Sequence, residues 1–364
     1  MDDLAHLATT PAFIVDRKRL QRNCTRMREK AAASGVSFRP HVKTHKVAEI
    51  GRMQHGGGFG PITVSTLAEA EHFAAAGFLD ITYAVPIAPD KLPRAAALAA
   101  KIERLNILLD SFEALHAVES FGTVFDAFLK IDCGYHRAGV EIHDPDSLRL
   151  ALAIVHSPRI RFQGLLTHAG HSYNARDEEE VRRIAAQEAA VLTRFRALDA
   201  ELAEVTRSIG STPTASVVER FAECDEVRPG NYVFYDAFQA KLGSCAMDDV
   251  AVSVLATVIG SYQDRRSMII DAGALALFKD LSPDHLDPSF GYGLVCDLDL
   301  NPLPMKLIAL SQEHGKIATE STLPVGTRLR IVPNHSCLTA AMYETFQIVD
   351  GQRLVDQWRP VHGW

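Results

Sequence analysis

The chain has 364 residues, of which 47% are hydrophobic and 23% are charged, and its formal net charge is -7. This composition is typical of a globular protein large enough for two domains, or for one large barrel with an addition. The negative charge argues against a general nucleic-acid binder. No apolar run reaches membrane-spanning length, and the acidic start Met1-Asp2-Asp3 does not resemble a signal peptide. The six cysteines show no paired spacing, so we expect no disulfide framework and a cytoplasmic location.

Strand-like and helix-like segments alternate over the first 240 residues or so. Short apolar runs predict strands at residues 10–16, 36–42, 62–66, 80–84, 106–110, 127–132, 162–168, 207–210 and 226–230. Helical patterns lie between them, including residues 17–33, 67–76 and 178–202. This alternation fits a (β/α)8 barrel better than an open sheet. No Gly-x-Gly-x-x-Gly follows the first strand, which weighs against a dinucleotide-binding fold.

The pattern changes after about residue 242. Strand-like runs at 250–259, 267–271, 307–310 and 328–332 follow one another without long helices between them. We therefore predict a barrel domain over residues 1–241 and a mainly β domain over residues 242–364. Whether the first residues of the chain pack with the second domain is left open.

Lys43 lies in the segment Arg39-Pro40-His41-Val42-Lys43-Thr44-His45-Lys46, at the end of a predicted strand. Barrel enzymes do their chemistry at the carboxyl ends of the strands. Nearby positive charge disfavours the ammonium form of a lysine, so we expect the Lys43 amine to be a nucleophile. Lys46 is the rival candidate, expected one turn into the following helix. A solvated basic loop is the alternative interpretation.

Two late segments are suited to binding a phosphate group. Gly210-Ser211-Thr212-Pro213-Thr214 combines glycine, small hydroxyls and exposed backbone N–H groups after a predicted strand. Arg228-Pro229-Gly230-Asn231-Tyr232 follows the last predicted barrel strand. Barrels commonly hold phosphate with the loops of their last two strands, although such residues also make ordinary turns.

A third motif, Pro333-Asn334-His335-Ser336-Cys337, suggests a metal site. In an extended segment residues i and i+2 point the same way, so we expect His335 and Cys337 to reach one ion from a strand end. An imidazole with a thiolate favours zinc. Two protein ligands leave the site open, as a Lewis acid requires. The alternative is a buried core pair, because cysteine is among the most buried residue types.

Together these segments resemble the pyridoxal-phosphate enzymes with an alanine-racemase-like barrel, in the branch of D-serine dehydratase and D-threonine aldolase. The resemblance runs from Pro11 to Trp364 and includes two further segments, Lys130–Gly139 and Thr167–Tyr173. It implies that Lys43 carries pyridoxal 5'-phosphate. It assigns the phosphate to Thr212, Gly230 and Asn231, and other cofactor contacts to Arg137 and Tyr173. Leu166 stands where some relatives have a second tyrosine.

The resemblance also implies an activity. D-Serine dehydratases share Pro-Asn-His-x-Cys, whereas D-threonine aldolases have an aspartate at the position of Cys337. A lyase dependent on pyridoxal phosphate and zinc is therefore expected, converting D-serine to pyruvate and ammonia. D-threo-3-Hydroxyaspartate dehydratase and metal-dependent D-threonine aldolase are the alternatives.

Two other readings of the resemblance fit less well. A racemase needs no metal, and a non-catalytic cofactor-binding protein would not need the β domain. Relatives with this layout imply a homodimer. Gln312–Gly315 also matches the family, and Glu313 or His314 is a candidate support for the metal.

Overall fold

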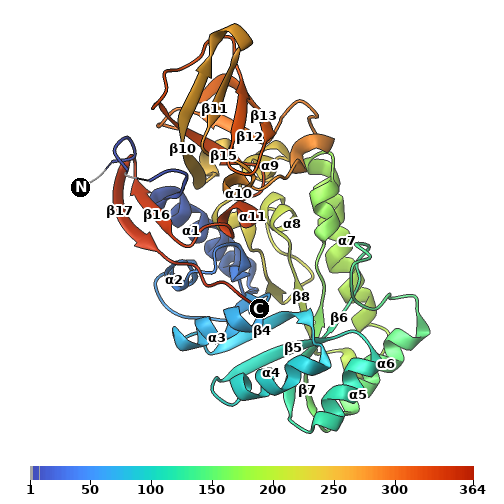
Figure 1. The fold of residues 1–364 in the computed structure, drawn as a ribbon. Coiled ribbons are helices and arrows are strands. Elements are labelled where there is room, and N and C mark those ends of the chain that lie inside the picture. Colours follow the sequence, from blue (N-terminus) through green and yellow to red (C-terminus); the bar gives the residue numbers. More distant parts are fainter. Residues whose placement is uncertain (1–2, 8) are drawn as a thin grey trace. The chain divides into compact units, whose positions relative to one another are not determined.

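The computed structural model describes residues 3–7 and 9–364 and divides into two compact units (Figure 1). One unit comprises the chain up to Cys24 together with Asn231–Pro360, and the other comprises Thr25–Gly230 with Val361–Trp364. Each unit is built on its own sheet. We call them the β unit and the barrel unit.

The barrel unit contains an eight-stranded parallel sheet in the order β2-β9-β8-β7-β6-β5-β4-β3. The sheet closes through a parallel bridge between His41 and Thr63, so that β2 and β3 meet. This confirms the predicted (β/α)8 architecture. Its strands are β2 (Ser37–Phe38), β3 (Ile62–Val64), β4 (Asp80–Pro86), β5 (Arg104–Leu109), β6 (Phe125–Lys130), β7 (Ile160–Leu166), β8 (Thr206–Ile209) and β9 (Glu226–Val227).

Helices connect these strands. They are α2 (Ala48–Gln54), α3 (Leu67–Ala75), α4 (Leu92–Ala99), α5 (Phe112–Phe121), α6 (Pro145–His156), α7 (Glu178–Arg196) and α8 (Thr212–Val217), while α1 (Arg17–Ser34) crosses the boundary between the units. Side chains at the starts of several helices accept a hydrogen bond from the backbone N–H three residues on; these caps are Thr66, Ser111, Asp177 and Ser211. The predicted helix over 178–202 is too long. The chain leaves α7 after Arg196, and Asp199 caps a separate short turn, Ala200–Leu202.

The β unit contains a nine-stranded sheet in the order β11-β14-β13-β12-β15-β10-β1-β16-β17, and β11 also pairs with β10. The strands from β10 to β15 therefore pair in a closed antiparallel ring. This confirms the predicted mainly β domain. The strands are β1 (Ala12–Asp16), β10 (Val252–Tyr262), β11 (Ser267–Ile270), β12 (Gly293–Cys296), β13 (Pro302–Leu310), β14 (Gly315–Ala318), β15 (Arg328–Pro333), β16 (Phe346–Asp350) and β17 (Arg353–Trp358). The helices are α9 (Ala237–Lys241), α10 (Ala274–Leu277) and α11 (Ser336–Ala340).

The first predicted strand belongs to the β unit. β1 lies between β10, to which it is antiparallel, and β16, to which it is parallel. Successive residues from Ala12 to Val15 are all buried, so both faces of the strand are covered, which explains its unbroken apolar run. Phe13 is fully buried and its ring packs against those of Phe234, Tyr343 and Phe346.

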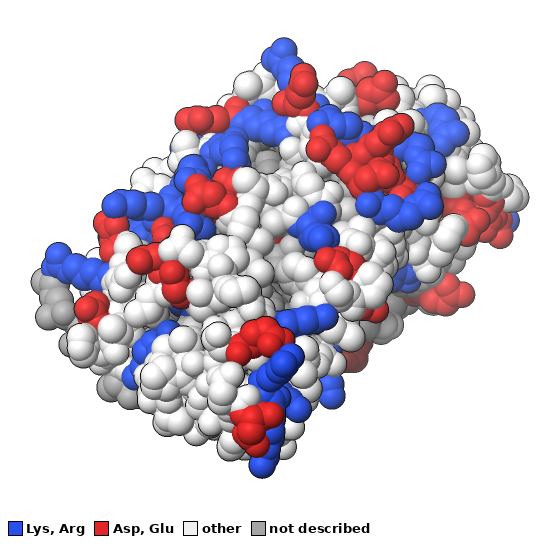
Figure 2. Space-filling view, turned by 90° about the horizontal axis from the view of Figure 1, so that it is seen from above, with Lys and Arg blue, Asp and Glu red and all other residues white. Residues whose placement is uncertain are grey.

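Two further expectations concern the whole chain. All six cysteines are free thiols. No helix in the described part of the chain is long and apolar enough to cross a membrane. On the face shown in Figure 2, acidic and basic side chains are interspersed, unlike the single basic stripe of a general nucleic-acid binder.

Candidate cofactor and metal sites

Five of the predicted cofactor residues follow the carboxyl ends of barrel strands. Lys43 follows β2, Arg137 follows β6, Tyr173 follows β7, Thr212 follows β8 and Gly230 follows β9. Because all the strands are parallel, these ends lie at the same end of the barrel. The fold thus brings together residues that are far apart in the sequence.

Lys43 lies in a short 3-10 turn, Val42–Thr44, directly after the barrel closure. Its backbone N–H donates to His41 Nδ1 at 3.4 Å. The rival Lys46 precedes α2 rather than lying within it, which corrects our expectation. Lys46 Nζ is 3.2 Å from Oε1 of the buried Glu69. An amine that is ion-paired with a buried carboxylate is a poor nucleophile. The contact therefore favours Lys43 over Lys46 as the lysine that reacts with the cofactor.

Two neutral histidines accompany Lys43. Burial, followed by the charge of Lys43, holds the pKa of His41 and that of His168 well below the ordinary value. His168 Nδ1 lies 2.7 Å from the carbonyl oxygen of Gly210. A carbonyl only accepts, so His168 carries its proton on Nδ1. The positive charge at this end of the barrel therefore resides on lysines and arginines.

Lys130 and Arg228 are basic residues at this end of the barrel; both lie within segments noted in the sequence, but neither was given a role there. Lys130 ends β6 and is 6% exposed; burial, then the charge of Arg228, lowers its pKa to about 7. Arg228 is buried, and its guanidinium donates to Ser208 Oγ at 2.7 Å and to the carbonyl oxygen of Thr167. Both of these acceptors are neutral, and the charges of Glu226 and Glu188 act on Arg228 as well.

Glycines let the backbone of two loops approach the strand ends closely. Gly210 has φ +141°, and a Cβ there would lie 2.7 Å from the backbone N of Arg228. A Cβ on Gly230 would lie 3.0 Å from the carbonyl oxygen of His41. Thr212 lies between these two glycines in the sequence. It is the first residue of α8 and is 1% exposed. The two loops that approach the strand ends closely, together with the buried basic side chains, fit a dianionic phosphate such as that of pyridoxal phosphate.

The His335–Cys337 pair lies in the β unit. β15 ends at Pro333, His335 caps α11, and Cys337 is the second residue of that helix. The expectation of an extended strand end is therefore wrong for the backbone. The two side chains nevertheless hydrogen-bond to one another, so the turn into α11 brings the imidazole and the thiol together.

Asp280 orients His335. Its Oδ2 accepts from His335 Nδ1 at 3.2 Å. Burial lowers the pKa of His335, but the hydrogen bonds with Asp280 and Cys337 outweigh it and raise that pKa well above the ordinary value. A carboxylate on one ring nitrogen leaves the other for a metal, as is usual for metal-binding histidines. Imidazole plus thiolate is a donor set that fits zinc.

Sequence reasoning missed Asp280, because it lies 55 residues before His335 with no spacing signal. Glu313 and His314, the candidates proposed instead, are exposed in the turn between β13 and β14.

Comparison with known proteins identifies the family. Residues 15–237 match the alanine racemase N-terminal domain, and residues 251–349 match the putative serine dehydratase domain. The D-threo-3-hydroxyaspartate dehydratase of Delftia sp. HT23 is 40% identical over the full length of both chains, and its structure superposes with a TM-score of 0.93. The chain belongs to the D-serine and D-threo-3-hydroxyaspartate dehydratase family.

Other members of this dehydratase family agree. The D-serine dehydratase of Dictyostelium discoideum is 36% identical, covering 100% of this chain and 99% of the relative. A cysteine-to-alanine variant of D-threo-3-hydroxyaspartate dehydratase, 39% identical with a TM-score of 0.93, is described as a metal-free form, which indicates that this relative uses a metal. The resemblance seen in the motifs is thus confirmed. The family is one of carbon–oxygen lyases, and its alanine-racemase-like barrel implies pyridoxal phosphate.

Within this dehydratase-family chain, the Asn231 side chain contacts the turn that carries His335 and Cys337. Its Nδ2 lies 2.9 Å from Asp236 Oδ2, 2.8 Å from Ser336 Oγ and 3.5 Å from Cys337 Sγ. Asp236 is buried and also accepts from the backbone N of Ser336 at 3.0 Å. The side chain of Asn231 therefore supports the turn that carries Cys337.

Proposed function

We propose that this chain is a D-3-hydroxy amino acid dehydratase that uses pyridoxal 5'-phosphate and zinc, with D-threo-3-hydroxyaspartate preferred over D-serine. The observation that carries the reaction type is the His335–Cys337 pair oriented by Asp280. Hydroxide is a poor leaving group, and a Lewis acid at the β-hydroxyl is the usual solution. The substrate order rests on the full-length relatives, at 40% and 36% identity. It reverses the order expected from the sequence.

In this proposal the segment 1–241 binds the cofactor and the segment 242–364 binds the metal. Pyridoxal phosphate, when bound, supplies an electron sink that makes the Cα proton of an amino acid removable. Lys43 Nζ would anchor the cofactor and, once released, take that proton. The phosphate would lie on Thr212, Gly230 and the backbone of Asn231.

The remaining roles follow from the chemistry of the side chains. Arg137 and Tyr173 would orient the cofactor ring. His335 Nε2 and Cys337 Sγ would hold zinc, which acts as a Lewis acid toward the substrate hydroxyl. Loss of water and hydrolysis of the resulting enamine give oxaloacetate and ammonia from 3-hydroxyaspartate, or pyruvate and ammonia from D-serine.

The test is product release from both substrates by protein loaded with cofactor and zinc. Oxaloacetate, pyruvate and ammonia are measured separately, with and without a zinc chelator. We expect ammonia and a 2-oxo acid in equal amounts, a higher kcat/KM for D-threo-3-hydroxyaspartate, and chelator sensitivity reversed by zinc. Glycine and glyoxylate from 3-hydroxyaspartate would reject dehydration in favour of aldol cleavage. A higher kcat/KM for D-serine would reject the substrate order.

We also propose that the chain forms a homodimer, because the layout of the resembled enzymes implies one. Light scattering on the purified protein tests this. A mass equal to that of one chain at assay concentration would reject it.

A further inference from the structure

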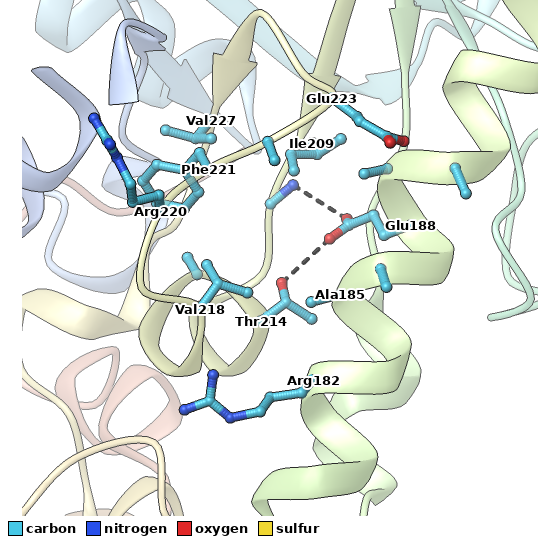
Figure 3. Close-up of a pocket in the computed structure, with 16 residues that line it drawn as sticks. Arg182, Ala185, Glu188, Ile209, Thr214, Val218, Arg220, Phe221, Glu223 and Val227 are labelled. Carbon is cyan, nitrogen blue, oxygen red and sulfur yellow. Dashed lines mark hydrogen bonds between the residues drawn. The ribbon is translucent and has the colours of Figure 1, made fainter. Parts of the chain in front are cut away.

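One buried carboxylate in the barrel unit has no part in the roles given above. Glu188 lies on α7 and is 0% exposed. Its Oε1 accepts from the backbone N of Ala169 at 2.9 Å. Oε1 also accepts from the backbone N of Gly210 at 3.1 Å, and Oε2 accepts from Thr214 Oγ1 at 3.2 Å (Figure 3). An ionised carboxylate offers acceptors only, which matches three converging donors.

The three donors come from the two loops that carry proposed cofactor residues. Ala169 lies in the loop between β7 and Tyr173, and Gly210 follows β8. Thr214 is in the first turn of α8, where it forms a reciprocal capping box with Ser211. Ser211 Oγ in turn lies 2.9 Å from Ser172 Oγ. Glu188 is therefore the point at which both loops are tied to α7.

A cavity lies beside the phosphate loop on the side that faces α7. A cavity of about 420 Å³ opens between α7, α8 and the end of β8, and Gly210 and Thr214 line it together with Glu188. Figure 3 shows the Glu188 side chain reaching from α7 to this loop beside the cavity. The hydrogen bonds of Glu188 therefore link α7 directly to residues 210 and 214 at the edge of this cavity.

Side chains outside the loop hold the backbone of Gly210 on both sides. Its φ of +141° is one that other residues rarely adopt. Its N–H is directed to Glu188, and its carbonyl accepts from His168 Nδ1. Both backbone polar groups of Gly210 are thus fixed by side chains outside the loop.

We propose that Glu188 is a positioning residue for the cofactor phosphate, acting through the backbone of residues 210–214. This inference rests on the proposed function, which places that phosphate at the same loop. Loss of the carboxylate loosens the loop and weakens binding of the phosphate group, while the amine chemistry of Lys43 is untouched.

The test compares pyridoxal phosphate with pyridoxal, which lacks the phosphate. Dissociation constants of both for the apoprotein are measured by absorbance titration of the full chain. We expect Glu188→Ala to weaken pyridoxal phosphate binding about tenfold, in the range for hydrogen bonds to a charged group. Pyridoxal binding should change less than about twofold. Glu179→Ala, an exposed glutamate on the same helix, should leave both constants unchanged.

The conservative variant gives a second readout. In Glu188→Gln the amide oxygen keeps both backbone donors, and its NH2 group donates to Thr214 Oγ1, since a hydroxyl accepts as well as donates. Most of the preference for the phosphorylated form should therefore return. If Glu188→Ala does not fold, Thr214→Val removes one of the three bonds and should reduce the preference about threefold.

The outcomes separate the two proposals. An equal loss of affinity for pyridoxal phosphate and pyridoxal in Glu188→Ala would overturn the positioning role, and so would an unchanged preference. A wild-type apoprotein that does not distinguish the two ligands would overturn the phosphate site itself, and the role of Glu188 with it.

Discussion

The carboxylate that orients the proposed metal ligand gives a quantitative test of the zinc site. In Asp280→Asn, Oδ1 still accepts from the backbone N of Ser282, at 2.7 Å in the wild type, so the local turn should survive. The amide NH2 group, however, faces His335 Nδ1 and can only donate to it. The imidazole must then carry its proton on Nε2, the nitrogen proposed to bind zinc.

Loss of such a partner typically lowers metal affinity 10- to 100-fold. The side chains of Asp280 and His335 are 20% and 29% exposed, so water partly replaces the lost contact. We therefore expect the lower end, about tenfold or about 1.4 kcal/mol. Competition against a zinc-binding dye at neutral pH measures it, with the exposed Asp284→Asn as control. A zinc affinity within twofold of the wild type in Asp280→Asn, or an equal loss in Asp284→Asn, would refute the reasoning.

Three further predictions concern the barrel unit. Lys43→Ala should reduce product release about a thousandfold or more, as for loss of a general base, whereas Lys46→Ala should retain most of it; equal losses would contradict the choice of lysine. Gly210→Ala should lower the free energy of unfolding by about 2 kcal/mol, because its Cβ would lie 2.7 Å from a backbone nitrogen, while Gly58→Ala, with only one atom within 4 Å, should change it little. Buried Lys130 has a pKa of about 7 against about 10.4 unfolded, so the unfolded apoprotein binds one proton more between these values. Its stability should therefore rise with pH in that window by up to about 1.4 kcal/mol per unit. Lys130→Met should remove this slope in urea unfolding, and identical slopes would refute it.

Much of the fold was predictable because periodicity reports burial. Residues 127–132 and 162–168 are apolar runs since parallel strands are covered on both faces, and the structure places β6 and β7 there. Some of the strands that the sequence did not predict are short, such as β12 and β14. Pairing partners were not predictable either. Nothing local in β1 indicates that it joins a sheet whose other strands begin 240 residues later.

The site was predictable only where its residues follow one another in the chain. The loop 210–214 and the pair His335 and Cys337 are short motifs that carry their chemistry in sequence order. Asp280 and Glu188 act through contacts that folding creates, 55 residues from His335 and 22 residues from Gly210. No spacing rule identifies such residues, because a lone acidic residue on a helix or loop is normally solvated.

The electrostatics of the two units follow from what each is proposed to hold. At the barrel strand ends Arg228 is a buried cation, burial lowers the pKa of Lys130 to about 7, and His41 and His168 are kept neutral. A dianionic phosphate would offset the unfavourable burial of positive charge at these strand ends. The acidic side chains around the donor pair of the β unit are instead Asp236, which is buried, and Asp280, which is partly buried. A dication is the partner that they favour. Each unit would therefore gain stability on binding its own group, so that apoprotein lacking both should unfold more readily than protein supplied with either one.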